Sequence, residues 1–181
     1  MVNSNILEIA IHANLKIIAD NKNVEIKHKL RLSDKSTWGI LFFLCGGVLL
    51  IIATFIKTSN TTTKISGIVI GLLLVALSIM TLIRQFTDGL KIKDNTFSFR
   101  YNLKKTTLPL SRSMEIKMRT EIIKIKRVGT IGTDFIVVTH FIQDLNNEII
   151  VLKFQMDNLY AEKARKLGNE ITRIINEKFR L

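Results

Sequence analysis

Two long apolar segments interrupt a chain that elsewhere alternates apolar and polar residues. Residues 38–56 and 65–83 each run for 19 positions without a charged side chain. A hydrocarbon core about 30 Å thick needs about 20 apolar residues in a helix, so each segment is long enough to cross it. Buried core helices in a small protein would show a polar stripe, and neither segment has one. The pattern predicts two transmembrane helices joined by residues 57–64, a short extracytoplasmic loop.

Small residues in both segments predict close contact between the two helices. Gly67 and Gly71 form a small-xxx-small pattern in the second segment, and Gly46 and Gly47 lie in the first. Such residues let neighbouring helix backbones approach closely in a membrane. A hairpin folded at the middle of the loop sets Thr54 opposite Gly67. We interpret these glycines as helix packing within one chain, with dimerisation as the alternative.

Residues 1–37 predict a cytoplasmic helix followed by a strand. Over residues 6–20, polar positions recur at three- and four-residue spacing, which is typical of a helix with a narrow polar stripe. An apolar strand is the alternative there, because many of the apolar residues suit a sheet. Residues 24–32 alternate apolar and charged side chains, which predicts a half-buried strand leading into the first membrane segment.

Residues 84–181 predict a small domain of strands. The runs 90–93 and 96–101 flank Asp94 and Asn95, a two-residue hairpin signal. Pro109 predicts a break in the ladder or the start of an edge strand, because proline has no amide hydrogen to donate. Further on, residues 114–122 alternate with one parity and then change phase, which predicts a bulge or a break at Ile122 and Ile123.

The end of this domain predicts another strand pair and a closing helix. The strands are expected at 135–142 and 148–154, and a helical repeat begins near Leu159 with Asp157 or Asn158 as its cap. Strands closed by one amphipathic helix indicate an antiparallel sheet with the helix on one side or end. The predicted fold class is therefore an α+β membrane protein: a two-helix transmembrane hairpin plus a cytoplasmic antiparallel β-sheet or roll.

Composition supports this division of the chain into an apolar hairpin and an ordinary water-soluble part. Of the 181 residues, 47% are hydrophobic and 23% are charged, and the 27 Lys and Arg against 15 Asp and Glu give a net charge of +12. Basic residues are retained on the cytoplasmic side of membrane segments. Nine of them flank the outer ends of the hairpin: Lys22, Lys27, Lys29, Arg31, Lys35, Arg84, Lys91, Lys93 and Arg100. Only Lys57 and Lys64 lie in the loop. The predicted localisation is the inner membrane, multi-pass, with both termini in the cytoplasm.

The C-terminal half resembles a known family. Leu90-Lys-Ile-Lys-Asp-Asn-Thr-Phe-Ser-Phe-Arg100, a basic connection, Thr107-Leu-Pro-Leu-Ser111, more strands and a closing helix are similar to the bacterial pleckstrin-homology-like (PH-like) domains that follow a membrane hairpin in small uncharacterised proteins. The resemblance implies a roll of seven strands. Six are counted after the hairpin, so the strand at 24–32 is a candidate for the seventh.

Positive charge is the one extended chemical feature. The resemblance implies an anionic headgroup near Arg100, Lys104, Lys105 and Arg112, and basic residues gain about 1 kcal/mol each beside an anionic leaflet. The alternative is that these side chains are retention signals and solvated strand faces. Nucleic acid is not an expected partner, because the membrane explains the charge and no nucleic-acid-binding signature is present.

Groups for catalysis or metal binding are not apparent in the sequence. Cys45, the single cysteine, lies inside the first apolar segment, and His12, His28 and His140 lack the spacing of metal ligands. We therefore predict no enzyme activity, cofactor or metal. The leading hypothesis is a PH-like scaffold or binding domain at the cytoplasmic leaflet, with a protein or anionic lipid as partner. The alternative is an accessory subunit of a transporter or secretion complex, and a membrane enzyme is the third hypothesis.

Overall fold

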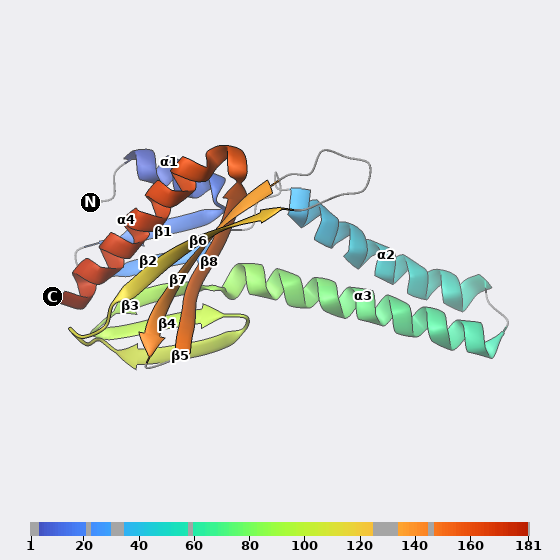
Figure 1. Cartoon of the computed structure of the whole chain (residues 1–181). Helices are drawn as coiled ribbons and strands as arrows, with labels where there is room; N and C mark the ends of the chain where they lie inside the picture. The colour runs from blue at the N-terminus through green and yellow to red at the C-terminus, as the bar shows by residue number, and fades with distance from the viewer. Residues whose placement is uncertain are drawn as a thin grey trace. The chain divides into compact units, whose positions relative to one another are not determined.

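The structure, a computed structural model, describes residues 4–20, 23–29, 35–57, 60–124, 134–144 and 147–180. The chain divides into two compact units, Met1–Lys29 with Thr87–Leu181, and Leu30–Phe86. Figure 1 shows the strands and two helices of the first unit and the two long helices of the second. The architecture confirms the α+β class with two apolar helices and antiparallel sheets.

The second unit consists of two long apolar helices, α2 (Lys35–Lys57) and α3 (Thr61–Thr87). Their segments Thr37–Lys57 and Thr61–Arg84 are long and apolar enough to cross a membrane. Both helices extend beyond the segments predicted from the sequence. The reason is that the polar residues at their ends continue the helix. Asn60, just before α3, caps it by accepting a hydrogen bond from the Thr62 amide through Oδ1 at 3.0 Å.

The N-terminal segment is half helix and half strand, so the prediction of one helix over 6–20 was wrong for its second half. Helix α1 (Ser4–His12) ends where Asn14 adopts a φ of 55°. Asparagine accepts this left-handed conformation, which stops a helix. Strand β1 (Leu15–Ala19) follows, with Leu15 and Ile17 buried and Lys16 exposed. The alternative of a strand therefore holds for these residues.

Five antiparallel strands form the larger sheet, sheet A, in the order β1, β2, β3, β4, β5. Strand β2 (Val24–His28) pairs with β1 on one side and with β3 (Gly89–Lys93) on the other. The predicted N-terminal strand therefore joins the sheet formed after the hairpin. Its continuation to residue 32 lies outside the described residues.

Two tight turns connect the last three strands of sheet A. Strand β4 (Thr96–Tyr101) follows the turn Asp94–Asn95, whose φ values are 49° and 57°, and β5 (Lys104–Pro109) follows the turn Asn102–Leu103, with 51° and 68°. Two successive positive φ values define the hairpin turn whose twist matches that of the strands. The first turn confirms the predicted hairpin. Pro109 lies on the edge strand β5, but it ends this strand instead of starting one.

Strands β6 (Ile116–Lys124), β7 (Asp134–Asp144) and β8 (Asn147–Asp157) form the three-stranded sheet B. The predicted bulge at Ile122 was wrong, since β6 pairs with β7 in one register throughout. Ile122 and Ile123 are both exposed, so neither parity is buried at that end of the strand. The register shift lies instead between β7 and β8, where Val151 has no partner residue opposite it on β7.

A single core fills the space between the two sheets and two helices. Sheet B crosses sheet A, with β8 against β3 and β4 (Figure 1). A short 3-10 turn, η1 (Asn158–Tyr160), is capped by Asp157 and leads into α4 (Ala161–Arg180), which packs on sheet B and on α1. Phe97 of β4 contacts Phe179 of α4 edge-on, at 5.3 Å between ring centres. The inner face of sheet A is therefore covered, and its outer face is left free of these elements.

Candidate functional site: a basic face on sheet A

The outer face of sheet A carries a row of basic residues that the strand register lines up. Lys16 pairs with Lys27, Lys27 with Gly89, Gly89 with Arg100, and Arg100 with Lys105. Residues directly opposite each other in antiparallel strands point to the same face. We call Lys16, Lys27, Arg100 and Lys105, with Gly89 at the centre, the basic row. Strands lie about 4.8 Å apart, so the row is about 19 Å long.

Gly89 contributes no side chain to the middle of the row. A Cβ atom built there would lie 2.4 Å from the carbonyl oxygen of Ile26 and 3.0 Å from the Cα atom of Lys27. Both are backbone atoms, so no side chain fits without moving β2. The result is a gap, two strand spacings wide, between the side-chain positions of Lys27 and Arg100. Two cations therefore flank a position of the row that carries no side chain.

The face is strongly unbalanced in charge. Its strand positions hold six basic side chains and one acidic side chain: Lys16, Lys27, Lys91, Lys93, Arg100, Lys105 and Glu25. Glu25 forms an ion pair with Lys27, with 2.5 Å between Oε1 and Nζ. The hydrogen bond from Lys27 lowers the pKa of Glu25, and the charges of Lys27, Lys91 and Lys16 lower it further, against a smaller opposing effect of burial. Three lysines thus surround one carboxylate.

Four cations of this face form no direct ion pair within the described parts of the chain: Lys16, Lys91, Arg100 and Lys105. Lysine and arginine side chains keep their charge at neutral pH. Like charges placed side by side on a sheet repel one another. A negatively charged surface or ligand would relieve this repulsion, so the face is suited to anion binding.

Of the four residues predicted to bind an anion, Arg100 and Lys105 are neighbours in the basic row. Lys104 pairs with Tyr101, so it has the opposite parity, although its side chain is exposed. Both lysines begin strand β5 instead of lying in a loop. Arg112 follows the far end of β5, about 17 Å from its start by strand length. The structure therefore brings two of the four together and separates Arg112 from them.

Lys16 is the member of the row that sequence reasoning missed. The sequence predicts a helix over residues 6–20, which places Lys16 in a polar stripe. The signal was present, because the exposed Lys16 lies between the buried Leu15 and Ile17 in a period of two. Lys27 and Lys91 had been recognised as basic strand residues, but their alignment with Arg100 depends on pairing across a segment of about 60 residues.

The hairpin glycines have three contacts between α2 and α3. A Cβ atom at Gly67 would lie 2.5 Å from Thr54 Oγ1, and one at Gly71 would lie 2.5 Å from Ile51 Cγ1. At Gly47 the nearest atom is the carbonyl oxygen of Gly71, at 2.9 Å. Gly46 has no atom within 4 Å of such a Cβ position. Packing within the chain therefore accounts for Gly47, Gly67 and Gly71, and Gly46 faces away from it.

His140 is a buried structural residue. It is fully buried in β7, and its Nε2 lies 3.1 Å from the carbonyl oxygen of Gly168 in α4. Its Nδ1 has no hydrogen-bond partner among the described residues. Burial lowers the pKa of His140 to about 4, with smaller opposing effects from backbone groups of Gly168 and Leu152. His140 is thus a neutral donor at pH 7 that joins α4 to sheet B.

Gly168 allows the close approach that this contact needs. A Cβ atom there would lie 2.4 Å from Met118 Sδ and 2.8 Å from Val138 Cγ1. Near the other end of α4, Asn176 exchanges two hydrogen bonds with the backbone of Ile116, at 2.8 and 3.0 Å. These contacts fix α4 on sheet B.

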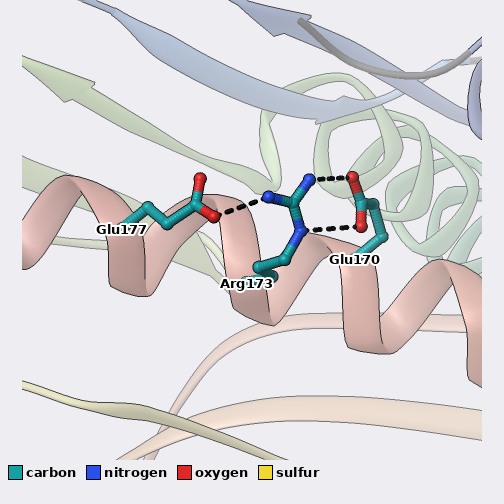
Figure 2. A network of polar contacts seen from close by, with 3 residues as sticks. All are labelled: Glu170, Arg173 and Glu177. Carbon is teal, nitrogen blue, oxygen red and sulfur yellow. Dashed lines mark hydrogen bonds and ion pairs between the residues drawn. The ribbon is translucent and has the colours of Figure 1, made fainter.

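Two arginines on the outer face of α4, Arg165 and Arg173, are paired within the helix. Figure 2 shows Arg173 between Glu170 and Glu177, forming two hydrogen bonds with the first and one with the second. The hydrogen bond from Arg173 lowers the pKa of Glu170, and the two glutamates raise that of Arg173. Arg165 pairs with Glu162 at 2.9 Å. These are exposed pairs at the helical spacings of three and four residues.

Metal-binding clusters of three or more His, Cys, Asp or Glu side chains are absent from the part of the chain that the structure describes. Cys45 is exposed on α2. Burial lowers the pKa of His28, against a smaller opposing effect of the Asp88 charge. Comparisons of the chain with protein-family models, with curated proteins and with solved structures found no match.

Proposed function

We propose that the chain is a non-enzymatic integral membrane protein that holds a PH-like binding domain at the cytoplasmic leaflet. The domain binds anionic lipid headgroups with the outer face of sheet A. The observation that carries this proposal is the basic row, in which pairing of five strands aligns four cations around a glycine. The two sheets and closing helix support the resemblance to a PH-like roll, although the described residues form eight strands, one more than the seven that the resemblance implies, because β1 is added at the edge of sheet A.

Chain connectivity supports a position of the row near the membrane. Gly89 lies five residues after Arg84, the last residue of the second candidate membrane segment. A chain of five residues spans at most about 17 Å. A basic residue near an anionic leaflet gains about 1 kcal/mol, and this gain falls off over a Debye length of about 8 Å at physiological salt. Along the chain, the centre of the row is therefore no more than about two Debye lengths from the last residue of that segment.

The direct test removes charge from the row and counts retained lipid. The full chain, solubilised in detergent with phosphatidylglycerol, is compared by native mass spectrometry with the triple variant Lys27→Gln, Arg100→Gln, Lys105→Gln. Three lost contacts of about 1 kcal/mol each predict a fall in phosphatidylglycerol affinity of about a hundredfold. Added salt should weaken the phosphatidylglycerol affinity further.

The matched control removes three exposed charges elsewhere in the same unit: Lys124→Gln, Lys166→Gln and Arg180→Gln. It has the same net charge as the row variant and is expected to keep its bound lipid. Equal losses in both variants would reduce the effect to net charge and would refute a site on sheet A.

The proposed topology has its own test. With both termini in the cytoplasm, protease added to inside-out vesicles should digest the C-terminal domain. Protection of residues 84–181 in those vesicles would refute the topology, whatever the lipid result.

The alternative of an accessory subunit of a transporter or secretion complex receives less support. It was motivated by the hairpin glycines, and three of the four lie at contacts between α2 and α3. A stable partner protein purified with the full chain in mild detergent would favour this alternative.

A further inference from the structure

The two tight turns of sheet A share one backbone conformation but differ in their residues. Asp94–Asn95 precedes β4 and Asn102–Leu103 follows it, and all four residues have φ between 49° and 68°. Asparagine, aspartate and glycine are the residues that accept this conformation readily. The first turn follows that preference at both positions. The second places Leu103 at a φ of 68°.

Packing in the core does not explain why a leucine occupies this position of the turn. It belongs neither to the buried core nor to the partly buried residues packed against it, and 37% of its surface is exposed. An asparagine or glycine would suit the turn better. A residue kept in an unfavourable conformation at an exposed turn points to a role outside the fold.

The turn is held close to the residue that follows α3. The Asn102 amide donates a hydrogen bond to Asp88 Oδ2 at 3.1 Å, and Asp88 is buried. Asp88 lies four residues after Arg84, a chain length of at most about 14 Å. The turn Asp94–Asn95 lies at the other end of β4, about 17 Å away by strand length. Of the two turns, the one with the leucine is therefore the one hydrogen-bonded to a residue that closely follows a candidate membrane segment in the chain.

The neighbours of Leu103 suit the surface of an anionic bilayer. Lys104 and Lys105 follow it directly, and Arg100 pairs with Lys105 in the basic row. An apolar side chain flanked by basic ones is the composition of segments that lie in the membrane interface. The cations contact headgroups while the apolar group enters the boundary with the acyl chains.

We propose that the turn Asn102–Leu103 inserts the Leu103 side chain into the leaflet that anchors the protein. The inserted leucine is a second contact beside the basic row and orients sheet A on the membrane. This inference rests on the proposed function, because the leaflet must be the anionic surface that the row binds.

The experiment compares the two turns by fluorescence. In a Cys45→Ala background, the full chain carries a single cysteine from Leu103→Cys or from Asn95→Cys, labelled with an environment-sensitive fluorophore. The proteins are reconstituted in nanodiscs of phosphatidylcholine with phosphatidylglycerol, with and without lipids that carry a shallow nitroxide quencher. We expect a blue-shifted, quenched signal at position 103 and an unshifted, unquenched signal at position 95.

A probe at position 103 that is as unquenched as the probe at 95 would overturn the inference. If charge removal from the row then still releases phosphatidylglycerol, only the insertion is refuted and the proposed function stands. If charge removal also has no effect, both are refuted.

A second variant keeps the test independent of folding. Leu103→Asn places a suitable residue in the turn, so the melting temperature of the detergent-solubilised protein should rise. Its affinity for phosphatidylglycerol, measured by native mass spectrometry as for the row variant, should fall about fivefold, through loss of partial burial of a leucine side chain. A raised melting temperature with unchanged affinity would overturn the inference.

Discussion

The outer face of sheet A and the outer face of α4 both carry exposed basic side chains, but they differ in the acidic residues among them. Helix α4 contains six basic and three acidic residues. Its arginines at 165 and 173 are bound to glutamates three or four positions away (Figure 2). The strand positions of the sheet face contain six basic residues and only Glu25 as an acid.

The difference shows that a count of basic residues does not by itself identify a binding surface. A helix brings residues three and four positions apart together, so a chain can pair its own charges locally. A sheet brings distant segments together, and the cations of the basic row come from four strands. Their repulsion is left for an external anion to relieve, whereas exposed helical pairs contribute only a few tenths of a kcal/mol each.

The largest expected effect concerns the buried contact that holds α4 in place. Because the pKa of folded His140 is about 4, below the 6.5 of an ordinary histidine, the unfolded chain binds the proton more readily. The contribution of His140 to the free energy of unfolding should therefore be fully present above pH 6.5. It should fall by roughly 3 kcal/mol as the pH drops toward 4. Unfolding of the detergent-solubilised protein by denaturant at stepped pH measures this slope.

The variant His140→Leu tests the origin of that slope, and His12→Gln, at an exposed histidine, is its control. His140→Leu should flatten the slope between pH 6.5 and 4.5. An unchanged slope would assign the pH dependence to other groups, of which His28 has a pKa lowered in the same direction.

The next effect concerns the close approach of α4 to sheet B. Gly168→Ala adds a Cβ atom that would lie 2.8 Å from Val138 Cγ1, so side chains must shift. Overpacking of this kind costs about 2 kcal/mol. Thermal unfolding should show a clear loss for Gly168→Ala. The neighbouring exposed variant Asn169→Ala should instead be neutral or slightly stabilising, and equal losses would contradict a specific steric contact.

Removal of the one acid on the sheet face should sharpen the contrast between the two faces. Glu25→Gln frees Lys27 from its ion pair and raises the net positive charge of the face by one. About 1 kcal/mol of added attraction predicts about fivefold tighter binding of phosphatidylglycerol. Native mass spectrometry can compare it with Glu162→Gln on α4, which should leave lipid affinity unchanged. Equal gains would place the effect in the net charge of the protein.

The smallest effect is expected on the outer face of α4. Arg173→Gln removes the exposed contacts with Glu170 and Glu177. Exposed helical pairs of this kind are worth about 0.3–0.5 kcal/mol each, so thermal stability should fall only slightly and lipid affinity should stay the same. A lipid effect as large as that of the basic row would remove the distinction between the two faces.

The sequence by itself determined the features that depend on local periodicity. The two apolar helices, the Asp94–Asn95 turn, the pairing of β7 with β8 and the C-terminal helix could be read from spacing, because side chains three to four or two positions apart share a face. The same reasoning erred at Leu15 and Ile17, where a short apolar segment fits either period, and Asn14 decided for a strand by ending the helix.

Only the tertiary structure decided which cations lie side by side. The pairing of β2 with β3 spans the whole hairpin and brings Lys27 next to Gly89, and the pairing of β1 adds Lys16. The separation of Arg112 from Lys105 likewise depends on the length and direction of β5. Strand register is set by burial of the inner face, where Val24, Ile26 and Leu90 are almost fully buried. A shift by one residue would point the basic side chains into that core, and this cost of burying charge is the physical reason that the row forms on the outer face.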